Sequence, residues 1–343
     1  MLAAALPLVG CGTLAAPAGD GNAVRPNAHA GPFRDATADE LPDTVRKVPY
    51  VLDDPNANYR ESVAVDLDGT GSLGRVALYV VADLAPGTGI YRFVSAHGRS
   101  FGKKPDPARP VLEPGAAWEG SFVGRPDVHV IGGKIWMLYQ AAGGIGLARS
   151  DDGRTFTREP GPVLGPDPAA AWEGGKTPGA PGLLKVADDD FRLFYAVDDR
   201  IGEARSSDGV TWKRAPGGPL LAPLAGSDAD APFDSASVGD PYALLATSAE
   251  GRRITRVYYA GGNADGQRGI GMAARFGVDG PLTRATAPVF PVALDARSPT
   301  VLPFSGFTLL YLTQIEGTAS TQDYPAVALG VAPGNASIPA PSP

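Results

Sequence analysis

Short stretches of β-branched and aromatic residues recur along most of the chain and alternate with polar, Gly- and Pro-rich turns, a pattern that predicts β-strands. The most regular of these stretches carries a tyrosine near its end and occurs five times, at Val76–Val80, Ile135–Gln140, Phe191–Ala196, Thr255–Ala260 and Phe307–Leu312. The tyrosines Tyr79, Tyr139, Tyr195, Tyr259 and Tyr311 are separated by 60, 56, 64 and 52 residues. A pattern that returns at such intervals indicates an internal structural repeat.

Three further strands accompany each tyrosine-bearing strand. A short apolar strand precedes it, at Ser62–Val65, Pro126–Val130, Pro181–Lys185, Pro241–Leu245 and Pro299–Leu302. A strand that often begins Ile-Gly follows it and runs into a turn such as Asp152-Gly153, where glycine supplies the positive φ of a tight hairpin. A fourth strand ends at a proline. Four antiparallel strands per unit and five units predict an all-β fold, a five-bladed β-propeller in which residues 50–52 complete the short last blade.

The composition agrees with this class. Apolar residues form 43% of the chain and charged residues 20%, and the 45 Gly and 34 Pro suit many short strands joined by tight turns. The net charge of −7, with scattered Lys and Arg, argues against nucleic-acid binding, which requires clustered basic residues. No apolar run reaches the about 18 residues of a membrane-spanning helix. We expect the propeller to be a monomer.

The single cysteine, Cys11, ends the run Leu-Val-Gly-Cys, which resembles the lipobox of bacterial lipoproteins, where the cysteine becomes the acylated N-terminus. The alternatives are a chance cysteine and a truncated ordinary signal peptide, because residues 1–10 contain no Lys or Arg and form a short leader. The expected organisation is a lipoprotein signal segment (1–11), a flexible tether (12–46), the propeller (47–332) and a disordered tail (333–343). The resemblance implies export and lipid anchoring to the bacterial cell envelope, at the outer membrane where two membranes are present.

Two motifs resemble family 43 glycoside hydrolases. The run Pro126-Asp127-Val128, followed by residues 133–139 (Gly-Lys-Ile-Trp-Met-Leu-Tyr), is similar to Pro-Asp-Val and Gly-Lys-Tyr-Tyr-Leu-Tyr-Tyr of that family. The Ser-x-Asp-Gly-x-x-Trp turn at Ser206–Trp212 recurs across the same five-bladed clan, which includes arabinanases, xylosidases, invertases and levansucrases. The resemblance covers about residues 50–332. It implies carboxylates on innermost strands at one mouth of the central channel, one activating water and one donating a proton to the leaving sugar.

The chain matches the catalytic positions of that family only in part. The first-blade Asp-Pro is missing, and Glu61 is its best substitute; the third blade has Ala180 before its proline; the fourth has Asp240 one position after the family's Glu. Asp127 and Asp240 alone lie in family-like settings. The resemblance therefore implies Asp240 as the acid, Glu61 or Asp127 as the base, and the cations Arg125 or Arg297 as orienting groups.

An aromatic–acid pair precedes three of the innermost strands, at Trp118-Glu119, Trp172-Glu173 and Phe233-Asp234. One interpretation is structural, with the aromatic ring between blades and the acid capping backbone amides. The other is a sugar-binding rim that includes Glu173 and Asp234. His129, inside an innermost strand, has the same two interpretations, a sugar-binding group or a buried, hydrogen-bonded histidine.

No cofactor or metal site is predicted. Residues 66–71 (Asp-Leu-Asp-Gly-Thr-Gly) look like the start of a calcium loop, but Ala77 occupies the position where a bidentate Glu is needed. The three histidines are dispersed, which excludes a zinc cluster.

Two functions remain open from the sequence. One is an envelope-anchored, glycosidase-like enzyme that cleaves a polysaccharide side chain; the other is a non-catalytic propeller that binds a glycan or a protein partner at the envelope. Geometry distinguishes them. Inverting hydrolysis requires two of the five carboxylates to lie within roughly 10 Å of each other around one open pocket; the five are Glu61, Asp127, Glu173, Asp234 and Asp240.

Overall fold

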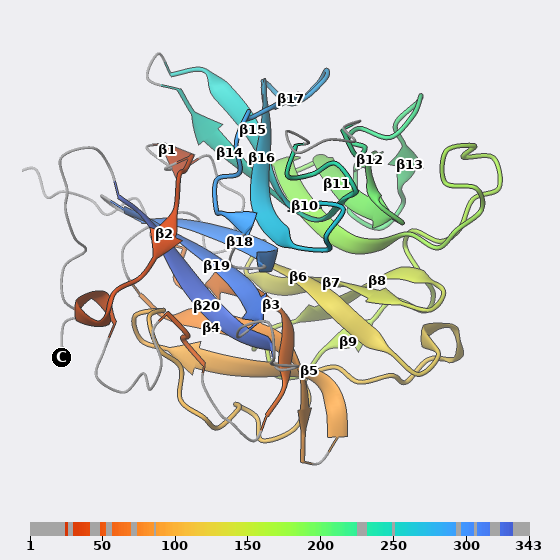
Figure 1. Cartoon of the computed structure of the whole chain (residues 1–343). Coiled ribbons are helices and arrows are strands. Elements are labelled where there is room, and N and C mark those ends of the chain that lie inside the picture. Colours follow the sequence, from red (N-terminus) through yellow and green to blue (C-terminus); the bar gives the residue numbers. More distant parts are fainter. Residues whose placement is uncertain are drawn as a thin grey trace, which may run out of the picture.

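A computed structural model shows an all-β molecule whose sheets are arranged radially, as in a propeller (Figure 1). It describes residues 25–26, 30–41, 49–52, 57–69, 74–85, 87–224, 232–248, 251–292, 296–304, 307–315 and 323–331. Helix is limited in these residues to two short 3₁₀ segments, Ala38–Glu40 and Ala117–Glu119. No helix among them is long and apolar enough to cross a bilayer.

Five sheets account for the strands. The first contains β3 (Tyr59–Asp66), β4 (Val76–Leu84) and β5 (Gly87–Ser95). The second contains β6 (Val123–Ile131), β7 (Lys134–Ala141), β8 (Gly144–Ser150) and β9 (Thr157–Arg158). The third contains β10 (Gly179–Ala187), β11 (Asp190–Val197), β12 (Arg200–Ser206) and β13 (Lys213–Arg214). The fourth contains β14 (Ser237–Thr247), β15 (Arg253–Gly262), β16 (Arg268–Phe276) and β17 (Thr283–Arg284), with β1 (Arg25–Pro26) added parallel to β14. The fifth contains β18 (Ala296–Phe304), β19 (Phe307–Ile315), β20 (Asp323–Val331) and β2 (Arg34–Asp35).

The all-β propeller is confirmed, but the prediction of five blades with four strands each is wrong. Four sheets have four antiparallel strands; the sheet of β3, β4 and β5 has three among the described residues. The predicted outer strand near Leu112 forms only an isolated bridge with Ile90, and the corresponding predicted segments form the same kind of bridge at Leu164, Leu221 and Phe290. The fourth strand of those other sheets is instead a two-residue strand, β9, β13 or β17, which the first sheet lacks among the described residues. Pro105 and Pro107 follow β5 there, and proline lacks the N–H that a ladder needs.

The sheets close into a ring through their innermost strands. β3 packs on β6, β6 on β10, β10 on β14, β14 on β18, and β18 again on β3. The core is correspondingly divided into five clusters of buried residues, each between two neighbouring sheets. Because every sheet is covered on both faces by its neighbours, the strands are apolar on both sides.

The fifth sheet is completed by β2 and not, as predicted, by residues 50–52. Arg34 and Asp35 pair antiparallel with Leu329 and Ala328 of β20, and Figure 1 shows β2 beside that strand. This segment lies inside the predicted tether, yet Phe33 and Leu41 on either side of β2 are buried. Residues 50–52 instead fill the core between sheets, and Val51 accepts a hydrogen bond from the Phe101 amide.

The five tyrosines do not occupy one register position. Tyr139, Tyr195 and Tyr259 donate to the acids of the aromatic–acid pairs, whereas Tyr79 and Tyr311 donate to the carbonyls of Gly153 and Gly98 in Asp-Gly-type turns. Strand pairing explains the difference: Tyr79 pairs with Val63, and Leu138, not Tyr139, pairs with the equivalent Asp127. A shift of one residue turns a side chain to the opposite face of a sheet.

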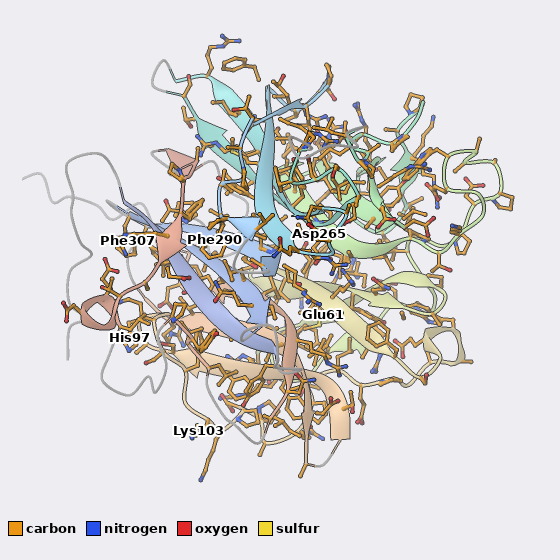
Figure 2. The ribbon with its side chains drawn as sticks, viewed as in Figure 1. Glu61, His97, Lys103, Asp265, Phe290 and Phe307 are labelled. Atoms are coloured by element: carbon orange, nitrogen blue, oxygen red, sulfur yellow. The ribbon has the colours of Figure 1, made fainter. Side chains whose placement is uncertain are left out.

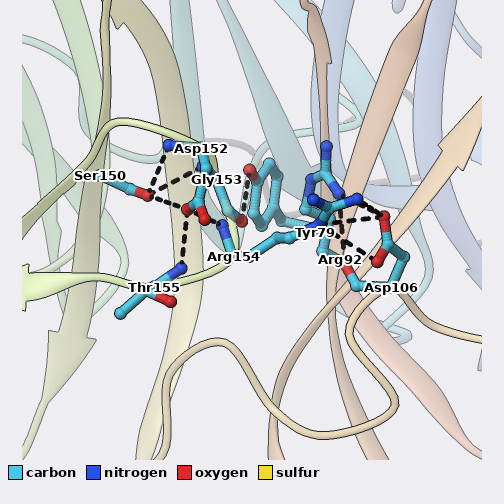
Figure 3. A network of polar contacts seen from close by, with 8 residues as sticks. All are labelled: Tyr79, Arg92, Asp106, Ser150, Asp152, Gly153, Arg154 and Thr155. Atoms are coloured by element: carbon cyan, nitrogen blue, oxygen red, sulfur yellow. Dashed lines mark hydrogen bonds and ion pairs between the residues drawn. The ribbon is translucent and has the colours of Figure 1, made fainter.

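The Asp-Gly turns connect neighbouring sheets. Figure 3 shows Asp152 Oδ1 accepting hydrogen bonds from the amides of Arg154 and Thr155 at 2.8 and 3.0 Å, which fixes the turn after β8. Arg154 then reaches Asp106, whose carboxylate also pairs with Arg92 of β5. The turn thereby ties the second sheet to the first, and it has a structural role as predicted.

Candidate functional site

Each innermost strand contains one residue with positive φ at its bulge. These residues are Glu61 (51°), Arg125 (43°), Ala180 (43°), Asp240 (47°) and Ser298 (52°). The pairing of every innermost strand with its neighbour shifts register at this point. A bulge re-aims a side chain, and non-glycine residues in this backbone conformation concentrate at functional sites.

The five bulge residues line one pocket on the propeller axis, which we call the axial pocket. Its cavity volume is about 30 Å³, and its mouth is open to solvent. Figure 2 shows Glu61 near the centre of the array, while Lys103 projects from its edge. Thr300 also borders the pocket, and its buried hydroxyl has no hydrogen-bond partner among the described residues. Each sheet thus contributes one bulge side chain to a shared central site.

Arg125 lies between the two carboxylates of the axial pocket. Its Nη1 pairs with Asp240 Oδ1, its Nε lies 3.6 Å from Glu61 Oε1, and its backbone amide donates to Glu61 Oε2 at 2.9 Å. Asp240 Oδ2 accepts a hydrogen bond of 3.2 Å from the Ser298 amide. Since one guanidinium touches both side chains, their carboxyl oxygens lie within roughly 10 Å of each other, as hydrolysis requires.

The guanidinium of Arg125 is held in unfavourable surroundings for a charge. Burial, the largest cause, lowers its pKa; Glu61 opposes this, and the nearby cations Arg268 and Arg297 lower the pKa further. Solvent still reaches 33% of the Arg125 side chain, 20% of Glu61 and 10% of Asp240. The three groups form a partly exposed charge cluster with a surplus of nearby positive charge.

Asp127 borders the axial pocket, but its side chain is hydrogen-bonded to other groups of the protein. The side chain is buried, and its Oδ2 lies 2.7 Å from His129 Nε2 and accepts a hydrogen bond of 2.6 Å from the Leu183 amide. His129 is also buried and stacks on Tyr242. Asp127 Oδ2 and His129 Nε2 are thus bound to each other, and both side chains are buried beside the pocket.

Glu173 and Asp234 are buried and are held by residues of their own sheets, which agrees with the structural interpretation of the aromatic–acid pairs. Tyr195 and Arg214 bind Glu173, and Tyr259 and Arg284 bind Asp234. Glu119 is held in the same way by Tyr139 and Arg158. Burial alone would raise the pKa of Glu119, but hydrogen bonds from the Ala116 amide, Tyr139 and the Gly115 amide and the charge of Arg158 outweigh it, so the pKa is lowered.

The remaining predicted residues divide into two cases. Arg297 precedes the bulge residue Ser298 and acts on Arg125 through its charge, but it is not part of the axial pocket wall. Cys11 lies outside the described residues. Among the residues that the structure describes, no three His, Cys, Asp or Glu side chains cluster as a metal site would require.

Phe122 is a member of the site that the sequence did not reveal. Its ring is 37% exposed just before β6. A Cβ placed on Gly124 would lie 2.3 Å from Phe122 Cζ and 2.6 Å from Glu61 Oε2, so the ring edge and the carboxylate are neighbours. An exposed aromatic ring beside a carboxylate offers an apolar face with a polar group at its edge. No repeat or motif distinguishes this phenylalanine.

A second hollow, the side pocket, opens from the axial pocket between the third and fourth sheets. Its cavity volume is about 180 Å³, and it shares Arg125, Ala180 and Asp240 with the axial pocket. Gln140, Asp199 and Arg268 contribute polar groups to its wall. These residues come from three different sheets, so no local sequence signal groups them.

Comparison with known proteins yields likeness of fold alone. No family model matches the chain, and no curated protein matches it in sequence. Solved structures do match. A structure of the GH130 family of mannoside phosphorylases, described as containing glycoside hydrolases that target β-1,2-mannosidic linkages in Candida mannan, is 16% identical, with a TM-score of 0.61 over 89% of this chain and 96% of the other.

Two further solved structures are similar to this chain in fold. A glycosyl hydrolase from Bacteroides ovatus is 15% identical, with a TM-score of 0.58 over 90% of this chain and 93% of its own. A GH62 hydrolase in complex with xylotriose is 11% identical, with a TM-score of 0.58 over 88% and 98%. The chain therefore has the propeller fold of glycoside hydrolase-like proteins.

Proposed function

We propose that the protein is a glycosidase-like enzyme that binds a saccharide in the axial pocket and hydrolyses a glycosidic bond there with Glu61 and Asp240. The observation that carries the proposal is that two carboxylates from different sheets share one partly open pocket and one arginine. Membership of family 43, which the sequence motifs suggested, belongs to the same proposal. The saccharide-bearing GH62 structure of the same fold supports a carbohydrate ligand.

The contacts of the two carboxylates suggest their roles. Asp240 pairs directly with Arg125, which favours its ionised form, so we assign it the base that activates water. Glu61 Oε1 lies 3.6 Å from Arg125 Nε, too far for a hydrogen bond, so we assign Glu61 the acid that donates a proton to the leaving sugar. This assignment reverses the roles that the resemblance implied. Arg125 orients both groups.

Hydrolysis is tested with a panel of nitrophenyl glycosides. We expect turnover by the unaltered protein and a loss of at least about 100-fold in kcat for both Asp240→Asn and Glu61→Gln, because each removes a general acid or base. Asp188→Asn is the matched control, since the Asp188 side chain is 99% exposed and distant from the pocket wall. Equal turnover by the two site variants and the control would remove Glu61 and Asp240 from the chemistry.

A binding-only protein is the second candidate, and the position of Arg125 favours it. The guanidinium contacts both carboxylates at once, and a charge cluster that is paired in this way also suits a site that binds a ligand through hydrogen bonds alone. Calorimetric titration of the same sugars separates the two candidates. Saccharide binding without turnover, weakened by Arg125→Met, would establish binding alone; turnover lost in Asp240→Asn would exclude it.

We further propose that Cys11 is lipidated and anchors the protein to the cell envelope. The Leu-Val-Gly-Cys run supports this assignment. Labelling of expressing bacteria with a radioactive fatty acid should mark the unaltered protein and leave Cys11→Ser unlabelled. Equal labelling of the two, or none of either, would reject lipidation.

A further inference from the structure

The side pocket exists because the third and fourth sheets carry small residues where other sheets carry larger ones. The bulge residue of the third sheet is Ala180, whereas the other four sheets place Glu, Arg, Asp or Ser there. On the second strands, Ala196 and Ala260 occupy the register position that holds Gln140 in the second sheet. Gln140 fills its space and accepts a hydrogen bond from the Ala180 amide, but the two alanines leave theirs empty.

The charges of the side pocket are balanced. Asp198 is neutralised by Lys176, and Asp240 by Arg125. One cation and one anion remain, Arg268 and Asp199, and neither has a salt-bridge partner among the described residues. A wall with no net charge provides no attraction for an ionic ligand, but planar polar groups on both sides suit the hydroxyls of an uncharged sugar.

The side pocket lies next to the axial pocket. Arg125, Ala180 and Asp240 belong to both walls, and Ala180 is the smallest of the five bulge side chains. A ligand unit held against Asp240 in the axial pocket therefore has the side pocket beside it.

We propose that the side pocket is a second sugar subsite, so that the ligand is an uncharged saccharide of at least two units. One unit lies in the axial pocket and the next between the third and fourth sheets, where Arg268 and Asp199 bind its hydroxyls. This inference rests on the proposed function, because it takes a saccharide in the axial pocket as given.

Calorimetric titration of the full-length protein tests the subsite. The probes are matched pairs of monosaccharide and disaccharide: xylose and xylobiose, mannose and β-1,2-mannobiose, arabinose and arabinobiose. The unaltered protein should bind one disaccharide at least about tenfold more tightly than its monosaccharide. Ala196→Phe, which fills the side pocket, and Arg268→Gln, which removes a donor without filling it, should each reduce that advantage to less than about threefold.

The matched control is Arg253→Gln, which makes the same chemical change at an exposed position at the opposite end of the fourth sheet. It should alter neither affinity. Equal affinity for monosaccharide and disaccharide in the unaltered protein overturns the subsite alone, as does a full disaccharide advantage in Arg268→Gln. Tighter binding of digalacturonate than of every neutral disaccharide overturns the uncharged ligand. A protein that neither binds nor cleaves any sugar of the panel overturns the proposed function as well.

Discussion

The ion pair between Arg125 and Asp240 should contribute measurably to the free energy of unfolding. The perturbation is a double-mutant cycle of Arg125→Met, Asp240→Asn and the double variant. Methionine keeps the aliphatic stem of the arginine, and asparagine keeps an oxygen that can still accept the hydrogen bond from the Ser298 amide. The cycle therefore isolates the charge–charge interaction from packing and from the backbone contact.

The structure sets the expected size of the coupling. Two unit charges about 4 Å apart attract by about 4 kcal/mol at an effective dielectric constant of about 20. Solvent reaches a third of the Arg125 side chain, which weakens the attraction, but only a tenth of Asp240. Exposed pairs contribute about 0.2–1 kcal/mol, and breaking a buried pair costs about 3–5 kcal/mol. We expect a coupling free energy of about 2 kcal/mol.

Urea unfolding followed by tryptophan fluorescence and by circular dichroism provides the measurement. Coincidence of the two transitions establishes the two-state behaviour that the cycle requires. The exposed pair Lys134–Asp151, with side chains 54% and 83% exposed, is the control and should couple by less than about 1 kcal/mol. A coupling below about 0.5 kcal/mol for Arg125 and Asp240 would refute the conclusion that the guanidinium holds this carboxylate in the axial pocket.

Three further predictions concern residues around the site. Asp127→Ala should lower the free energy of unfolding by about 2–4 kcal/mol in urea titration, because it leaves the buried Leu183 amide and His129 unpaired. The saccharide affinity of the folded variant should stay unchanged. A loss of affinity without a loss of stability would contradict this prediction. Phe122→Ala should weaken saccharide binding about 3- to 10-fold in calorimetry with little change in stability. Phe276→Ala, the same substitution at another exposed position, is the control and should leave saccharide affinity unchanged. Equal weakening by both variants would remove Phe122 from the site. The pKa of Glu119 is lowered in the folded state, so its carboxylate stabilises the fold fully above its ordinary pKa of about 4.3, and this stabilisation disappears as the pH falls. Glu119→Gln should therefore lower the free energy of unfolding at pH 7 and lower it progressively less below about pH 4. A loss that grows on acidification would contradict this sign.

The aromatic–acid pairs illustrate how far the sequence leads toward the site. Their recurrence marked Glu119, Glu173 and Asp234 as important, and recurrence by itself is equally compatible with a sugar-binding rim. Their partners decide the matter, because each acid meets a tyrosine from the second strand and an arginine from the outermost strand of its own sheet. Those partners lie 20 to 50 residues away, beyond the range of any local pattern.

The sequence by itself determined the strands, the Asp-Gly turns and the all-β class, since alternation of side chains and the backbone preferences of glycine and proline act over a few residues. It also marked Glu61, Arg125 and Asp240 as candidate site residues. Only the tertiary structure decided that β2 completes the fifth sheet, that Tyr79 is offset by one residue from Tyr139, and that Arg125 stands between two carboxylates. These features depend on how the ring closes and how each bulge turns its side chain toward the axis. Closure brings together residues more than 60 positions apart, and no short-range property of the chain specifies their distance.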